Sequence, residues 1–255
     1  MAVQDLLQHP DLWRAGQLRA SQAFPTTPSG FAALDVHLPG NGWPEAGLME
    51  LMLETSGIGE LKLLAPALQS LSHQARWIAW INPPFIPYAP ALSALGIDIS
   101  KILLIHPKNH EDALWALERA SKSGTCSITL AWLDERRLRL KDTRRLQLAA
   151  KQGGTLSCLF RPAEASEQAS MAELRLKLAP AGPIELAISI VKRRGGWPLT
   201  NLKVLMAHEL KTQDMQEQLA CWRQARRRHA RPPQAPPLLL TPELKPVAHS
   251  DRAMH

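Results

Sequence analysis

The sequence is poor in tyrosine, phenylalanine and cysteine. It has one Tyr, four Phe and three Cys in 255 residues. Cys126, Cys158 and Cys221 are odd in number and scattered, which excludes a disulfide framework and indicates reduced thiols in a reducing compartment. No apolar run approaches the roughly 18 residues of a transmembrane helix. The first residues also lack the basic and apolar regions of a signal peptide. We therefore expect a cytoplasmic protein with no membrane partner.

The chain does have enough apolar sequence for a core. Apolar residues make up 45% and charged residues 21%, which excludes global disorder. The 30 Lys and Arg outnumber the 23 Asp and Glu, giving a net charge of +7. Much of this excess lies between Trp222 and His255, where seven basic residues face two acidic ones. The charge favours an acidic partner without identifying it.

Short apolar segments alternate with amphipathic segments through the middle of the chain, which predicts strands alternating with helices. Two later segments, 174–180 and 185–194, alternate apolar and polar residues as antiparallel edge strands do. We therefore expect an α/β fold with a mostly parallel, doubly wound sheet and antiparallel edge strands. The other expected strands are 47–53, 75–81, 99–107, 126–133 and 154–160, and the expected helices are 61–71, 88–95, 109–124 and 144–152.

Tryptophan is the abundant aromatic residue, with eight copies. Four of them fall on the expected strands and helices, which predicts that they are mostly core. Trp43 and Trp197 each adjoin Pro and Gly in loops, where they would either anchor a partner or cover the sheet edge. The four expected in the core are Trp77, Trp80, Trp115 and Trp132.

The sequence divides into three regions. Residues 1–28 form an N-terminal helix, expected at 3–18, with a linker arm; residues 29–212 form the core; residues 213–255 form a basic helix and a flexible Pro-rich tail. Within the tail, five arginines form a patch that would bind the phosphates of DNA, dock on an acidic protein surface, or simply be solvated. They are Arg223, Arg226, Arg227, Arg228 and Arg231.

The order of motifs resembles a known family. Over residues 27–206, the run TTPSGFAALDVHLPGNGWPEAGLMEL followed by WIAWI, LGIDISKILLIHP and EDALWALERASKSG resembles the ATPase core of RecA. The segments LPGNGWPEAGLMEL, GIGELKLLAPAL and PPFIPYAPALSALGID resemble ImuA more closely, the RecA- and SulA-like accessory family of bacterial mutagenic translesion synthesis. The resemblance implies a RecA-like P-loop-type core and induction in the SOS response to DNA damage. It also implies binding to ImuB, an inactive Y-family polymerase homologue, indirect contact with an error-prone polymerase, and binding to RecA, for which the helix at 3–18 is the candidate contact.

The phosphate loop of such a core is degenerate. A working loop reads G-x-x-x-x-G-K-[ST], whose amides cradle phosphates while the Lys neutralises them and the hydroxyl holds Mg²⁺. Here the turn reads ETSGIGELK. With Gly59 as the second loop glycine, Glu60 stands at the lysine position, Leu61 at the hydroxyl position, and Lys62 is displaced. Gly57 and Gly59 still precede a helix, so they would either attract an anion or merely make a tight turn.

Three further parts of a phosphoryl-transfer site are also missing. In register with RecA, Trp132 replaces the metal-orienting Asp, with Asp134 two residues later. Pro84 falls at the general-base position, and Arg161 or Pro162 at the amide that senses the γ-phosphate. We therefore predict a protein that is not an enzyme, holds no cofactor or metal, and serves as a scaffold in translesion synthesis and DNA repair.

Three other functions remain open. A SulA-like cell division inhibitor that binds FtsZ would share the degenerate core. A plain DNA-binding module would bind naked DNA with a steep salt dependence. An active ATPase would need Lys62 and Asp134 to replace the absent groups.

Overall fold

The computed structural model describes residues 25–206. The N-terminal helix expected at 3–18 and the basic helix and tail expected at 213–255 lie outside these residues. The arginine patch of the tail, Arg223, Arg226, Arg227, Arg228 and Arg231, also lies outside them, so its role stays a prediction.

The described chain contains short pairing strands, a central run of alternating strands and helices, and a final run of strands. The helices are α2 (Ala32–Asp35), α3 (Glu60–Ser72), α4 (Ala89–Ala94), α5 (His110–Lys122) and α6 (Leu140–Gly153), with 3-10 turns η1 (Ile99–Lys101) and η2 (Ala163–Glu167). The strands are β1 (Thr26–Thr27), β2 (Trp43–Pro44), β3 (Gly47–Leu53), β4 (Trp77–Ile81), β5 (Ile102–Ile105), β6 (Cys126–Trp132), β7 (Leu156–Pro162), β8 (Leu174–Gly182), β9 (Glu185–Lys192) and β10 (Leu199–Leu205).

One sheet of eight strands organises the molecule, in the order β10-β9-β8-β3-β7-β6-β4-β5. The six strands from β8 to β5 run parallel, and β9 and β10 are antiparallel additions. The expected mostly parallel α/β sheet is therefore confirmed. The expectation for 174–180 was half right, because β8 is antiparallel to β9 but parallel to β3. Strand β10 was not expected.

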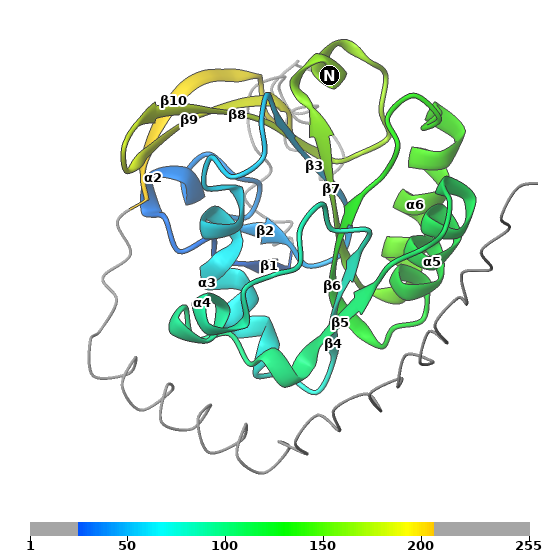
Figure 1. Ribbon diagram of the computed structural model, residues 1–255. Coiled ribbons are helices and arrows are strands. Elements are labelled where there is room, and N and C mark those ends of the chain that lie inside the picture. Colours follow the sequence, from blue (N-terminus) through cyan, green and yellow to red (C-terminus); the bar gives the residue numbers. More distant parts are fainter. Residues whose placement is uncertain (1–24, 207–255) are drawn as a thin grey trace, which may run out of the picture.

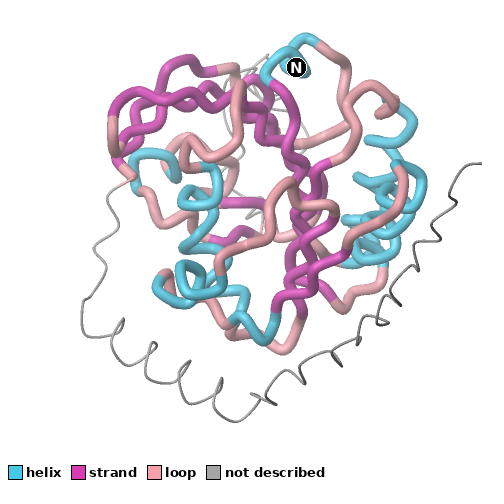
Figure 2. The backbone as a smooth tube through the Cα atoms, in the orientation of Figure 1, coloured by secondary structure: helices cyan, strands magenta, loops and turns pink. Residues whose placement is uncertain are grey.

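Helices cover both faces of the parallel part of the sheet, with α3 and α4 on one side and α5 and α6 on the other (Figure 1). The strand layer between them is clear in Figure 2. Alternate residues of β3 serve the two cores: Met49, Leu51 and Leu53 join the α3 side, and Leu48 joins the α5–α6 side. All seven residues of β3 are buried, as expected for a central parallel strand.

The four tryptophans expected in the core are not all buried. Trp80 is buried and Trp132 half-buried, but Trp77 and Trp115 are 38% and 59% exposed, so the core assignment of these two was wrong. Trp77 is the first residue of β4 and therefore lies at one end of the strand. The Lys101 ammonium lies 5.6 Å from the centre of its ring. Trp115 lies on α5, with the Arg119 guanidinium 5.7 Å from its ring.

The two described cysteines, Cys126 and Cys158, are buried free thiols, as expected. Burial raises the pKa of both, and the nearby Glu50 carboxylate raises the pKa of Cys158 further. Both thiols therefore stay protonated at neutral pH. Among residues 25–206, no helix combines the length and apolar character needed to cross a bilayer.

Candidate functional site

The turn that corresponds to the phosphate loop joins β3 to α3. Gly57 and Gly59 both have positive φ, at 89° and 115°, which is why glycine suits these positions. Glu60 is the first residue of α3, and its side chain turns back into the loop. The Gly57 N–H donates to Glu60 Oε1 at 2.8 Å, and the Gly59 N–H donates to Oε2 at 3.1 Å. These two loop amides are thus satisfied by the protein's own carboxylate.

This contact bears on the alternatives that the sequence left open for Gly57 and Gly59. Backbone N–H groups at a helix N-terminus attract an anion, and here the anion is the Glu60 side chain, which is only 6% exposed. A phosphate would have to displace a covalently tethered carboxylate of the same sign of charge. Lys62, the displaced lysine, is exposed and makes no hydrogen bond or ion pair with any described residue.

The other expected positions of a phosphoryl-transfer site are filled by groups with different roles. The Trp132 ring stacks on Phe160, with centroids 4.3 Å apart and an interplanar angle of 4°. Asp134 is exposed, and its carboxylate accepts a hydrogen bond from the Arg136 N–H at 3.1 Å, which fixes the turn that it starts. Among the described residues, no group of three or more His, Cys, Asp or Glu side chains could hold a metal.

A cavity of about 240 Å³ lies where β3, β6 and β7 end. Ligands of open α/β sheets bind outside the carboxyl ends of the strands, so this cavity lies where such a sheet would bind a ligand. Its lining mixes apolar and polar groups: Leu53, Glu54, Thr55, Ser56, Trp132, Leu133, Phe160, Arg161 and Pro162.

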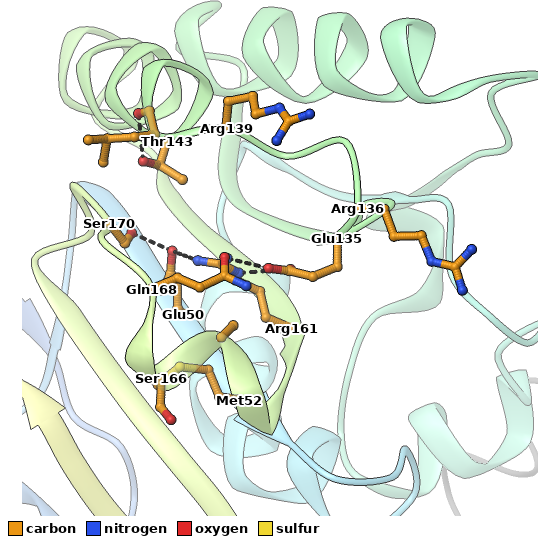
Figure 3. Close-up of polar contacts among 12 residues, drawn as sticks. Glu50, Met52, Glu135, Arg136, Arg139, Thr143, Arg161, Ser166, Gln168 and Ser170 are labelled. Carbon is orange, nitrogen blue, oxygen red and sulfur yellow. Dashed lines mark hydrogen bonds and ion pairs between the residues drawn. The ribbon is translucent and has the colours of Figure 1, made fainter.

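Beside this cavity, four charged side chains form a largely buried network; Figure 3 shows three of them, Glu50, Glu135 and Arg161, and the fourth is Arg175. Glu50, in the middle of β3, is fully buried; its Oε1 accepts from Arg161 at 2.8 Å and its Oε2 from Arg175 at 2.6 Å. Arg161 also binds Glu135 through two guanidinium nitrogens. Burial opposes the Arg161 charge, but hydrogen bonds and charges of Glu135 and Glu50 outweigh it and raise the Arg161 pKa. The two negative and two positive charges balance, as buried charges require.

Strand register explains why these charges meet. Glu50 lies directly opposite Arg175 on the neighbouring β8, and Arg161 lies on β7 opposite Met52, two residues beyond the position opposite Glu50. Arg175 also donates to the carbonyls of Ala165 at 2.6 Å and Gln168 at 3.0 Å, which fixes the η2 turn. The sequence analysis missed Glu50, Glu135 and Arg175, and it considered Arg161 only as a replaced sensor. The available signal was charge inside an otherwise apolar run: Glu50 in GLMELML, and Arg175 together with Lys177 in LRLKL.

Large apolar side chains are exposed around β5. The loop after β4 begins beside the end of β5, because the Asn82 N–H donates to the Ile105 carbonyl at 2.8 Å. This loop and the edge strand carry five exposed residues, which we call the β5-edge surface: Phe85 (75%), Ile86 (83%), Tyr88 (72%), Leu103 (39%) and Leu104 (43%).

Comparison with known proteins shows which family part of this chain is similar to. The family model described as cell division inhibitor SulA matches residues 49–157. This segment is similar to SulA. It contains Glu50, Glu60 and the whole β5-edge surface, whereas Arg161, Arg175 and the strands β8 to β10 lie outside it.

Individual relatives agree with the family match. The cell division inhibitor SulA of Photorhabdus laumondii is 35% identical over 117 residues, which are 46% of this chain and 65% of that protein. SulA of Edwardsiella piscicida is 34% identical over 102 residues, 40% of this chain and 60% of that protein. This chain thus spans about three fifths of the length of the curated relatives that it matches. The crystal structure of SulA from Pseudomonas aeruginosa is 29% identical, covers 45% of this chain and 97% of that one, and superposes with a TM-score of 0.38.

Proposed function

We propose that this protein is a SulA-like inhibitor of cell division that works by binding FtsZ and not by turning over a nucleotide. The similarity of residues 49–157 to SulA supports the class. This was the alternative function in the sequence analysis, and it now has more support than the scaffold role in translesion synthesis. The observation that carries the proposal is the β5-edge surface, which lies within the SulA-like segment.

An exposed apolar surface of this kind needs a partner. Leu103 and Leu104 are consecutive residues of the edge strand and point to opposite faces of the sheet. Phe85, Ile86 and Tyr88, by contrast, are grouped on the loop. Large exposed apolar side chains grouped in this way mark interaction sites. Phe85, Ile86 and Tyr88 follow one another on a proline-rich loop, whose restricted backbone lowers the entropy lost on binding. Aromatic side chains also dominate binding energy in protein interfaces. We infer that this surface contacts FtsZ.

Catalysis has no support in the same segment. Glu60 fills the loop where phosphates would lie, and Trp132 stands where a metal-orienting carboxylate would be needed. Phosphoryl transfer depends on positioning and on positive charge around the phosphates. We propose that the protein is not an enzyme.

The test is binding of the purified full chain to FtsZ, measured by biolayer interferometry. We expect the double variant Phe85→Ala/Ile86→Ala to bind about tenfold more weakly or worse, since tenfold corresponds to about 1.4 kcal/mol. Leu148→Ala is the matched control, because Leu148 is 61% exposed on α6. Absence of binding by the wild-type chain would overturn the proposed function. Equal binding by the double variant would overturn only the role of the surface.

A second candidate is the ImuA-type scaffold that binds ImuB and RecA. A specific observation favours it: β8, β9 and β10 extend the sheet beyond the SulA-like segment, and the buried Glu50–Arg175 pair joins them to it. Capture of ImuB or RecA by the full chain, without capture of FtsZ, would replace the first proposal with this one. Loss of that capture on charge reversal at Arg226, Arg227 and Arg228 would assign the contact to the basic tail.

A further inference from the structure

The cavity at the carboxyl ends of β3, β6 and β7 has lost the charge that a nucleotide site needs. Its mouth carries Glu54, and the neighbouring loop amides already bind Glu60. Any phosphate entering there would meet the Glu54 carboxylate, and it would find the Gly57 and Gly59 amides of the neighbouring loop already bound to Glu60. The cavity therefore repels the ligand class that this edge of the sheet would otherwise suit.

The positive charge of Arg161 does not cancel the negative charge at the cavity. Its guanidinium lines the cavity but is only 4% exposed, and it is bound to Glu50, Glu135 and the Gln168 side chain. The buried network is neutral as a whole. Glu54, by contrast, is exposed and has no hydrogen-bond or ion-pair partner among the described residues. The uncompensated charge at the cavity is thus negative.

The other residues that line the cavity determine which kind of ligand fits it. Leu53, Phe160 and Pro162 give apolar walls, and Thr55 and Ser56 add side-chain oxygens that can accept hydrogen bonds. A volume of about 240 Å³ falls below the roughly 300–1,000 Å³ of pockets for drug-sized ligands. A small cavity with apolar walls and one carboxylate suits a long aliphatic stem that ends in a cation.

We propose that this cavity receives an arginine or lysine side chain of a partner protein, with its stem against the apolar walls and its cation on Glu54. Arginine fits better, because its planar guanidinium can bind the Glu54 carboxylate through two parallel hydrogen bonds. The inference does not depend on FtsZ being the partner, so failure to capture FtsZ would leave it standing.

The test uses the full chain and a small probe. N-acetyl-arginine methylamide is titrated while the indole N–H of Trp132 is followed by NMR, with that signal assigned from a Trp132→Phe variant. We expect a saturable shift with a dissociation constant on the order of millimolar, as a single side chain allows. The citrulline analogue has the same shape without the charge and should bind about fivefold more weakly or not at all.

Two variants complete the experiment. Glu54→Gln should weaken arginine binding about fivefold, which is the size expected of one partly exposed ion pair. Glu167→Gln should leave it unchanged, because Glu167 is an exposed, unpartnered carboxylate of the described chain outside the cavity lining. No saturable shift, equal binding of citrulline, an unaffected Glu54→Gln variant, or tighter binding of ATP than of the arginine probe would each overturn the proposal.

Discussion

Glu50 and Glu60 are both buried carboxylates, yet their surroundings give them different roles. Glu50 is held in the middle of the sheet by two guanidinium groups, and it joins the SulA-like segment to β8. Glu60 is held at the rim by two backbone N–H groups, and it occupies the turn that would otherwise bind an anion. The same chemical group therefore stabilises the fold at one position and closes a site at the other. Glu50 is bound by positively charged guanidinium groups, whereas Glu60 is bound by backbone N–H groups, which carry only partial charges.

The largest effect is expected at Glu50. Glu50→Ala would leave two buried arginines short of a counter-charge, and breaking a buried pair costs about 3–5 kcal/mol. Urea unfolding of the full chain, followed by tryptophan fluorescence, measures the loss. Glu50→Gln keeps the shape and should still lose most of this stability. A loss below about 1 kcal/mol for both variants would contradict the ionic role.

Arg175 tests whether the network joins the added strands to the SulA-like segment. Arg175→Met would leave the Ala165 and Gln168 carbonyls and the Oε2 atom of Glu50 without their Arg175 donor, while Arg161 would still bind Oε1, and we expect a loss of about 2–3 kcal/mol. Hydrogen exchange should show the opening concentrated in η2, β8 and β9. Uniform loss of protection across the sheet would show that the pair does not act locally.

The smallest stability effect, but the sharpest change in binding, is expected at Glu60. Glu60→Ala removes a helix N-terminal acceptor, which costs about 1 kcal/mol. It also frees the Gly57 and Gly59 amides, so phosphate should raise the Tm of the variant more than that of the wild type. Differential scanning fluorimetry with and without phosphate measures this. Glu45→Ala, outside the loop, is the control; an identical phosphate response in all three proteins would show that Glu60 does not block the turn.

Much of the fold could be predicted from the sequence because most of its parallel strands are short, predominantly apolar runs. GLMELML and CSITLAW read as buried strands and are buried throughout, apart from half-buried Trp132. Strand β10 could not be read in this way. A register shift between Leu199 and Leu202 breaks the alternation on which strand prediction depends.

The sequence predicts that the phosphate loop is degenerate, but it does not predict how the residues of the candidate site are arranged in space. Glu60 at the lysine position is visible in the sequence and predicts a failed phosphate loop. That its carboxylate turns back onto Gly57 and Gly59 depends on the positive φ of both glycines, which no residue pattern specifies. The Glu50 network depends on which strands become neighbours, because Arg175 is 125 residues away along the chain. The β5-edge surface likewise depends on β5 being the last strand of the sheet.

The most direct test of the central claim is FtsZ polymerisation in the presence of GTP, followed by sedimentation. The full chain, without ATP, should lower the amount of sedimented FtsZ in proportion to its concentration, and added ATP should make no difference because Glu60 fills the loop. The Phe85→Ala/Ile86→Ala variant should lose this effect, whereas Leu148→Ala should keep it. Unchanged FtsZ polymers, or inhibition that requires ATP, would contradict the account.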